Sequence, residues 1–139
     1  MKNIFMVAIT LLALYNPVYS QTNKFDGSKI SKAAVSTILG HSISDMKVKK
    51  ISENLYRVTY FDPPINRFKG QWVKTLIKID NQNIIWKPDT KSGRWRNDPY
   101  YDDEVITYKV KSNKLIITET YTDNSKHTEI YSVNQFSNK

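Results

Sequence analysis

The residues best suited to chemistry lie in one segment near the middle of the chain. Gly93-Arg94-Trp95-Arg96 is followed by Tyr100-Tyr101 and then by the acidic run Asp102-Asp103-Glu104. The chain has only four arginines, and two of them flank Trp95. Guanidinium, indole and phenol groups bury much area at a small cost in conformational freedom, and they are common at interface centres and on carbohydrate platforms. We therefore predict a partner-binding site made of Arg94, Trp95, Arg96, Tyr100 and Tyr101.

The same segment has a structural interpretation. Arg94 and Arg96 would then form ion pairs with Asp98, Asp102 or Asp103 and hold the loop in place. Trp95 would close the end of a sheet as part of the core, since aromatic side chains dominate cores by buried area.

The chain carries little that indicates catalysis. Its two histidines, His41 and His127, lack zinc-ligand spacing, and no serine lies in a G-x-S-x-G motif. The contiguous acids of residues 102–104 point in different directions, and they lack both the pairing of a glycosidase and the spacing of a calcium loop. We expect a non-catalytic protein without a metal or cofactor.

The first twenty residues predict export. Lys2 is followed by an apolar run, Ile4–Leu14, that is too short to span a bilayer, and Val18-Tyr19-Ser20 resembles a cleavage site. We interpret residues 1–20 as a signal peptide and residues 21–139 as a single α+β domain, either periplasmic or secreted. The chain has no cysteine, hence no lipobox, and no Asn-x-Ser/Thr acceptor, which favours a bacterial source. No second long apolar run follows, so we expect no membrane insertion after cleavage.

The charge is unevenly distributed along the chain. Residues 21–97 carry fifteen Lys or Arg against six Asp or Glu, a net +9, whereas residues 98–139 carry five against seven, a net −2. A basic surface favours anionic partners such as an acidic protein or an anionic glycan. A compositional bias toward lysine would produce the same excess. An exported protein meets little nucleic acid, so we do not expect that partner.

The hydrophobic pattern predicts one helix followed only by strands. Ile30, Ala33, Ala34 and Ile38 recur at a helical period, with Ser28 as the expected N-cap and Gly40 as the stop. Alternating segments joined by short Asn/Asp/Ser turns then predict seven strands in successive hairpins. These strands are expected at residues 46–51, 55–61, 72–79, 84–87, 104–111, 115–122 and 128–133. The fold class is therefore α+β, with one N-terminal helix packed on an antiparallel meander of about seven strands.

The same alternation indicates what lies on each face of the sheet. Apolar residues should face the helix, and basic residues of neighbouring strands could form a stripe on the solvated face. The candidates for this stripe are Lys47, Lys49, Lys50, Lys74 and Lys78. Trp72 and Trp86 lie within strands and are expected to face the interior.

Gly93-x-Trp95 resembles the glycine-x-tryptophan pair of lipocalin-type barrels, although here it lies in mid-chain and follows a leading helix. The resemblance implies, as an alternative fold, a small β-barrel with a leading helix. A curved sheet of that kind would carry a small hydrophobic ligand in a pocket lined by Trp72 and Trp86.

These observations favour a small exported binding protein of the inhibitor, immunity or envelope-accessory type. Its partner would be a protein or an anionic cell-envelope glycan, bound through the basic and aromatic loop at residues 88–103. A ligand carrier and an exported hydrolase remain alternatives, the latter because the members of a Ser–His–Asp site can come from distant positions.

Overall fold

The computed structural model describes residues 24–97 and 101–137. The predicted signal peptide at residues 1–20 lies outside these ranges. Within them, one α-helix, α2 (Gly27–Leu39), precedes seven strands. The strands are β1 (Lys47–Ser52), β2 (Leu55–Asp62), β3 (Gln71–Asp80), β4 (Asn83–Pro88), β5 (Val105–Lys111), β6 (Lys114–Thr120) and β7 (Lys126–Ser132). Two short 3-10 helices, η1 (Ile43–Asp45) and η3 (Val133–Phe136), follow α2 and β7. None of the described helices has the length and apolar character needed to cross a membrane.

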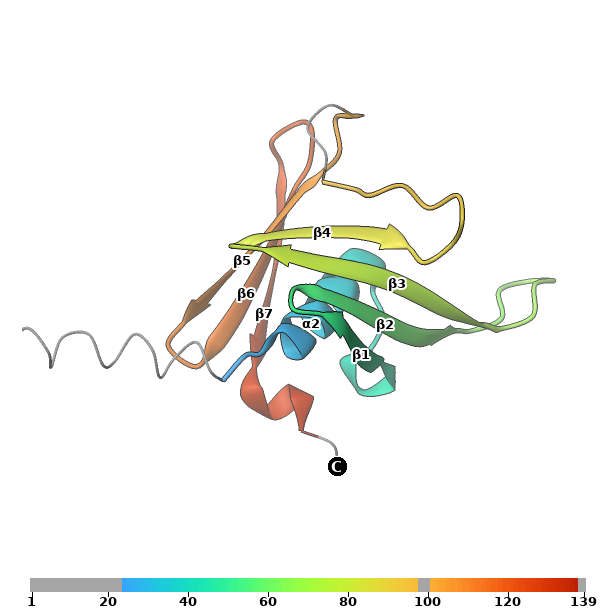
Figure 1. Cartoon of the computed structure of the whole chain (residues 1–139), viewed down its shortest axis with the longest axis horizontal. Coiled ribbons are helices and arrows are strands. Elements are labelled where there is room, and N and C mark those ends of the chain that lie inside the picture. Colours follow the sequence, from blue (N-terminus) through green and yellow to red (C-terminus); the bar gives the residue numbers. More distant parts are fainter. Residues whose placement is uncertain (1–23, 98–100, 138–139) are drawn as a thin grey trace, which may run out of the picture.

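The seven strands form one antiparallel sheet whose spatial order is the order of the chain (Figure 1). Each strand pairs with the next one along the chain, and β1 and β7 remain the two edges. The predicted antiparallel meander behind a single helix is confirmed. The alternative of a lipocalin-like barrel is wrong, because a helix covers the inner face of this sheet instead of the sheet closing on itself.

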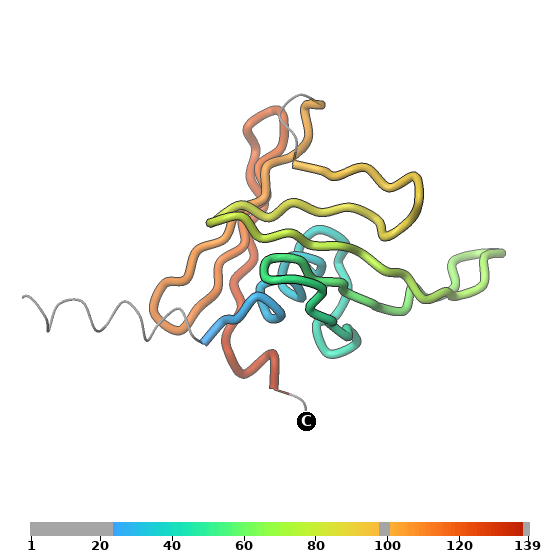
Figure 2. Tube along the Cα trace, viewed as in Figure 1, coloured from blue at the N-terminus to red at the C-terminus, as the bar shows by residue number. Residues whose placement is uncertain are grey.

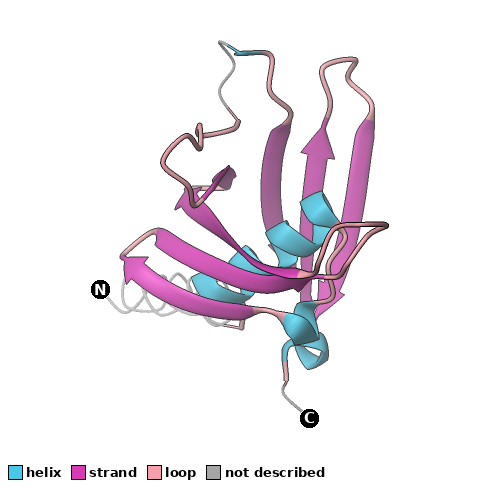
Figure 3. Ribbon diagram, turned by 90° about the vertical axis from the view of Figure 1, so that its right-hand side faces the viewer, coloured by secondary structure: helices cyan, strands magenta, loops and turns pink. Residues whose placement is uncertain are grey.

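The sheet is bent where β4 meets β5. These two strands share only the pairs Asn83–Thr107 and Ile84–Ile106, whereas β2 and β3 pair along their lengths from Leu55–Lys78 to Asp62–Gln71. Figure 3 shows β5–β7 standing at a steep angle to β1–β4, with α2 inside the bend. The helix contacts β1, β2 and β3 in one half and β6 and β7 in the other.

Small side chains let the helix approach the sheet closely. Ala33, Ala34 and Val35 on α2 are fully buried and meet branched side chains from both halves of the sheet. Those on the sheet are Val58, Ile77, Ile84, Ile106, Leu115 and Ile117. Near the end of α2, the Thr37 hydroxyl donates to the Ala33 carbonyl at 2.9 Å and accepts a hydrogen bond from the Tyr131 hydroxyl of β7 at 2.8 Å.

Both ends of α2 are capped by standard hydrogen bonds, but the N-cap is not the residue expected from the sequence. Asp26, not Ser28, is the N-cap: its backbone is extended and its Oδ1 accepts the Lys29 N–H at 2.9 Å. The carboxylate also interacts favourably with the positive end of the helix dipole, which a serine hydroxyl does not. Gly40 ends the helix as predicted, in the left-handed conformation at φ 72°, and its N–H donates to the Ser36 carbonyl.

This assignment predicts different effects for two neighbouring substitutions. Asp26→Ala should lower the free energy of unfolding by about 1 kcal/mol, because it removes the N-cap acceptor. Ser28→Ala, in the first turn of the helix, should change it by less than about 0.5 kcal/mol. Urea unfolding of the two variants measures this difference, and equal effects would contradict the cap assignment.

Candidate functional site

The loop between β4 and β5 folds back beside β4. Arg96 and Trp86 form an antiparallel backbone bridge, in which the Arg96 N–H donates to the Trp86 carbonyl at 2.6 Å. The Asn97 side-chain amide donates to the Ile84 carbonyl at 2.9 Å. The described part of this long connection is therefore anchored to the sheet along its second half.

Arg94 has a structural role in this loop. Its guanidinium donates two hydrogen bonds to the Asp103 carboxylate, at 2.7 and 2.8 Å, and lies 4.4 Å from the centre of the Tyr101 ring. The Asp103 side chain is only 4% exposed, so a charge-assisted pair closes the loop at a partly dry position. This is one of the ion pairs that the structural interpretation of the segment expected. Tyr100 and Asp98 lie outside the described residues.

Trp95 and Arg96 lie on opposite sides of the sheet. The Arg96 guanidinium is 5.2 Å from the Trp86 ring centre, and Trp86 belongs to the core on the helix side. Trp95 stacks instead with Lys87, whose Nζ is 5.1 Å from the indole centre. The predicted binding residues therefore form separate contacts rather than one cluster: Arg94 with Tyr101, Trp95 with Lys87, and Arg96 with Trp86.

The expectation that Trp72 faces the interior is wrong. Trp72 is 60% exposed, whereas Trp86 is 8% exposed. In β3 the inward residues are Thr75 and Ile77, so Trp72 shares the opposite face with Lys74, two residues further along. The two tryptophans thus lie on opposite faces of one sheet and do not line a common pocket. Trp72, Lys74 and Lys78 are separated by even numbers of residues and so share one face of the strand, which was the sequence signal that Trp72 lies outside.

The outer face of β1–β4, turned away from α2, gathers basic side chains. Strand register places Lys49, Arg57 and Lys87 in one row across the sheet, in which Leu76 of β3 lies between Arg57 and Lys87. Lys47 and Lys74 occupy the next row through Thr59, and Lys78 lies opposite Ile85. We call these six residues the outer basic face: Lys47, Lys49, Arg57, Lys74, Lys78 and Lys87. Lys50 was expected in this stripe, but it pairs with the buried Tyr56 and so lies on the other face.

Aromatic rings flank the outer basic face, and acids are few. Trp72 lies toward the β2–β3 loop, 5.4 Å from the Phe61 ring and 5.9 Å from Lys47 Nζ, and Trp95 lies over Lys87 on the β4 side. Asp89, just after β4, is bound to Arg57 at 2.6 Å, which neutralises both charges. The face combines mobile ammonium groups with planar rings on a rigid sheet, an arrangement that suits contact with an anionic surface.

Both histidines lie near acids. The His41 ring is 4.2 Å from the Tyr60 ring, and its Nε2 is 3.9 Å from Asp62; His127 Nε2 is 3.2 Å from Glu129. The described residues include no group of three or more His, Cys, Asp or Glu positioned to hold a metal ion.

One buried acid, Glu119, is not among the residues predicted from the sequence. Glu119 of β6 faces inward among apolar residues and accepts a hydrogen bond from the Tyr121 hydroxyl at 3.0 Å. This hydrogen bond to a carboxylate raises the pKa of Tyr121 above its ordinary value. The period of two in β6 put Glu119 on the same face as Leu115 and Ile117, and this was the available signal.

No family model, curated protein or solved structure matches this chain.

The loop anchor can be tested with two neighbouring acids. Asp103→Asn should lower the free energy of unfolding by about 1–3 kcal/mol, because it weakens a charge-assisted pair at a buried carboxylate. Asp102→Asn is the matched control: Asp102 is exposed and has φ 51°, a conformation that Asn adopts readily. Thermal unfolding and amide exchange of residues 94–97 measure both effects. A stable D103N variant with unchanged exchange would contradict the anchoring role.

The raised pKa of Tyr60 predicts how the stability of the fold depends on pH in the alkaline range. Burial raises the pKa of Tyr60 above its ordinary 10.0, the nearby Asp62 carboxylate raises it further, and a hydrogen bond with Thr75 acts in the opposite direction. Because the folded state holds this proton more tightly than the unfolded state, the stabilisation is complete below about pH 10 and is lost as the pH rises further. Urea unfolding between pH 8 and 11 should show a smaller alkaline loss in Tyr60→Phe. The same slope in both proteins would contradict this role.

Proposed function

We propose that this protein is an exported, non-catalytic binding protein that engages an anionic partner through the outer basic face. The partner is an acidic protein or an anionic glycan of the cell envelope. The export part of the proposal depends on the predicted signal peptide at residues 1–20.

The observation that carries the proposal is the strand register of β1–β4. It brings six basic residues from four strands onto one face, although they are scattered over more than forty positions of the chain. Asp80, the last residue of β3, is the one acid that these four strands add to that face, and Asp89 pairs with Arg57. The five lysines leave the face with a net positive charge, which attracts anionic partners over several ångströms and sets the orientation of encounter.

The loop residues predicted from the sequence divide between two roles in this proposal. Trp95 lies over Lys87 and extends the outer basic face with a planar apolar group. Arg94 and Arg96 support the fold, the first through Asp103 and the second by covering Trp86. We therefore assign contact with the partner to the outer basic face and to Trp95 at its border, and not to the loop as a whole.

Capture from the host's envelope fraction tests this division. Trp95→Ala and the double variant K49E/K78E should each lower capture at least tenfold, while the melting temperature stays within about 3 °C of that of the unmodified chain. Arg96→Ala should instead lower the melting temperature, because it exposes Trp86.

A matched charge change provides the control. K50E/K126E alters the net charge as much as K49E/K78E does, but Lys50 lies on the opposite face and Lys126 on β7. Its capture should stay within twofold of the unmodified chain. Equal losses in the two double variants would show that net charge alone acts, and the proposed face would be wrong. Capture should also fall as NaCl rises from 50 to 300 mM, because salt screens exposed charges.

A further inference from the structure

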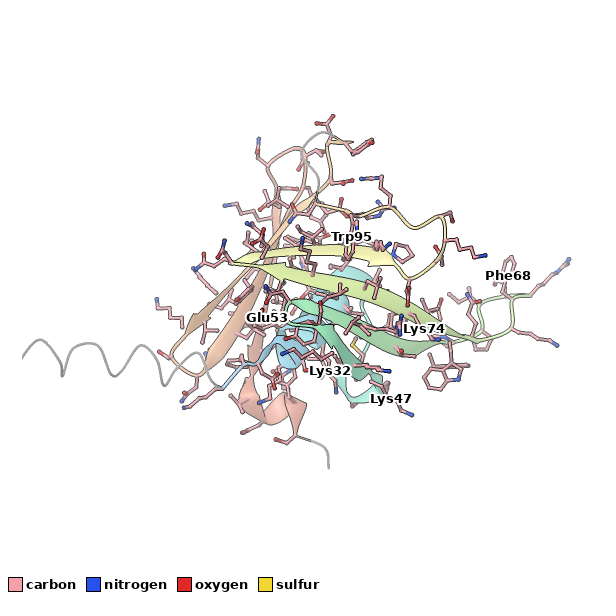
Figure 4. All side chains as sticks on the ribbon, viewed as in Figure 1. Lys32, Lys47, Glu53, Phe68, Lys74 and Trp95 are labelled. Carbon is pink, nitrogen blue, oxygen red and sulfur yellow. The ribbon has the colours of Figure 1, made fainter. Side chains whose placement is uncertain are left out.

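The hairpin of β2 and β3 extends beyond the rest of the molecule as an arm. Figures 1 and 2 show its end projecting on its own, away from α2 and from β5–β7. We call residues 63–69 the arm tip. Among the large hydrophobic side chains of the described residues, the two most exposed lie here: Phe68 at 79% and Ile65 at 62%. Figure 4 shows Phe68 at the outer end of the arm.

The arm tip has a defined turn that presents these side chains. The Phe68 N–H donates to the Ile65 carbonyl at 3.0 Å, and Asn66 between them has a left-handed backbone at φ 57°. At the base of the arm, Gly70 packs so closely against the Phe61 ring that a Cβ atom there would overlap it. The glycine lets the two strands close beneath the tip, which holds Ile65 and Phe68 away from the core.

The surroundings of the arm tip are basic. Residues 63–73 contain Arg67 and Lys69 and no Asp or Glu; Asp62 lies at the base of the arm, opposite Gln71. Arg67 and Lys69 flank Phe68 in the chain and are exposed. Trp72, further down the arm, is exposed beside Lys47. The order from the tip inward is thus apolar side chains with interleaved cations, followed by an indole.

We propose that the arm tip inserts shallowly into an anionic lipid surface. Ile65 and Phe68 enter the boundary between headgroups and acyl chains, Arg67 and Lys69 bind lipid phosphates, and Trp72 lies at the level of the headgroups. Aromatic rings and long cationic side chains occupy these depths because each combines an apolar body with a polar end.

The projection of the arm tip away from the rest of the molecule favours a bilayer over a protein partner. A protein would need a cavity fitted to a protruding tip, whereas a bilayer accommodates one without a preformed site. Arg67 and Lys69, the two cations of the arm tip, match an anionic leaflet, where each basic side chain near the surface adds to the attraction.

The proposal goes beyond the proposed function and does not depend on it. Ile65 and Phe68 lie at the end of the arm, whereas Lys49, Lys78 and Trp95 lie on the body of the molecule. It also departs from the expectation that nothing inserts after signal cleavage. That expectation came from the absence of a second long apolar run, and a shallow insertion by two side chains requires no such run.

Vesicle binding tests the insertion. Vesicles of phosphatidylglycerol and phosphatidylethanolamine provide the anionic surface, and phosphatidylcholine vesicles provide the neutral one. I65S/F68S should lower partitioning into anionic vesicles at least tenfold, and R67Q/K69Q should lower the preference for anionic over neutral vesicles. Ile130→Ser removes a side chain of β7 that is 54% exposed, and it should leave partitioning unchanged. The full chain and a form starting at Gln21 are compared, because residues 4–14 are themselves apolar.

A local probe separates insertion from general adhesion. The chain has no cysteine, so Pro64→Cys and Thr122→Cys can each carry one environment-sensitive dye, at the arm tip and at the β6–β7 turn. Anionic vesicles should shift the dye emission to the blue at position 64 and not at position 122. Equal shifts at both positions, unchanged partitioning of I65S/F68S, or no binding to anionic vesicles would each overturn the proposal. Capture of a single envelope protein that depends on Phe68, without vesicle binding, would overturn it in favour of a protein partner.

Discussion

The structure depends on one constraint: a single short helix must cover the apolar face of a seven-stranded sheet. With 13 residues, α2 is about 20 Å long and about 10 Å wide, whereas seven flat strands would extend over about 29 Å. A flat sheet would leave apolar strands uncovered. The two-pair junction of β4 and β5 lets the sheet bend, so that both halves reach Ala33, Ala34 and Val35.

This packing decides which surfaces remain for function. The inner face is taken up by the core, so contact with partners is left to the outer face and to hairpins that extend past the helix. β2 and β3, with 8 and 10 residues, are the longest strands of the described chain, and their far ends have no helix beneath them. On the inner face, burial ends after Tyr60, because the next inward pair, Asp62–Gln71, is polar and accessible.

Much of the fold could be predicted because it follows from local chemistry. The helix stop at Gly40 and the strand alternation each reflect a backbone or burial preference that acts over a few residues. The N-cap was assigned two residues late, because Ser28 and Asp26 can both cap and only the position of the first turn distinguishes them. Trp72 was assigned to the interior because aromatic residues usually are buried, although its spacing of two residues from Lys74 placed both side chains on the same, outer face.

The candidate site was harder to predict, because it depends on which strands become neighbours. By itself the sequence determined the α+β class, the strand segments, the basic character of residues 21–97 and the density of arginine and aromatic residues near Trp95. The tertiary structure alone decided that Arg94 pairs with Asp103, that Arg96 covers Trp86 and that Trp95 lies over Lys87. The reason is that periodicity reports which face a residue occupies within its own strand. The residue across from it depends on register and on the bend around α2, and both are set by long-range packing.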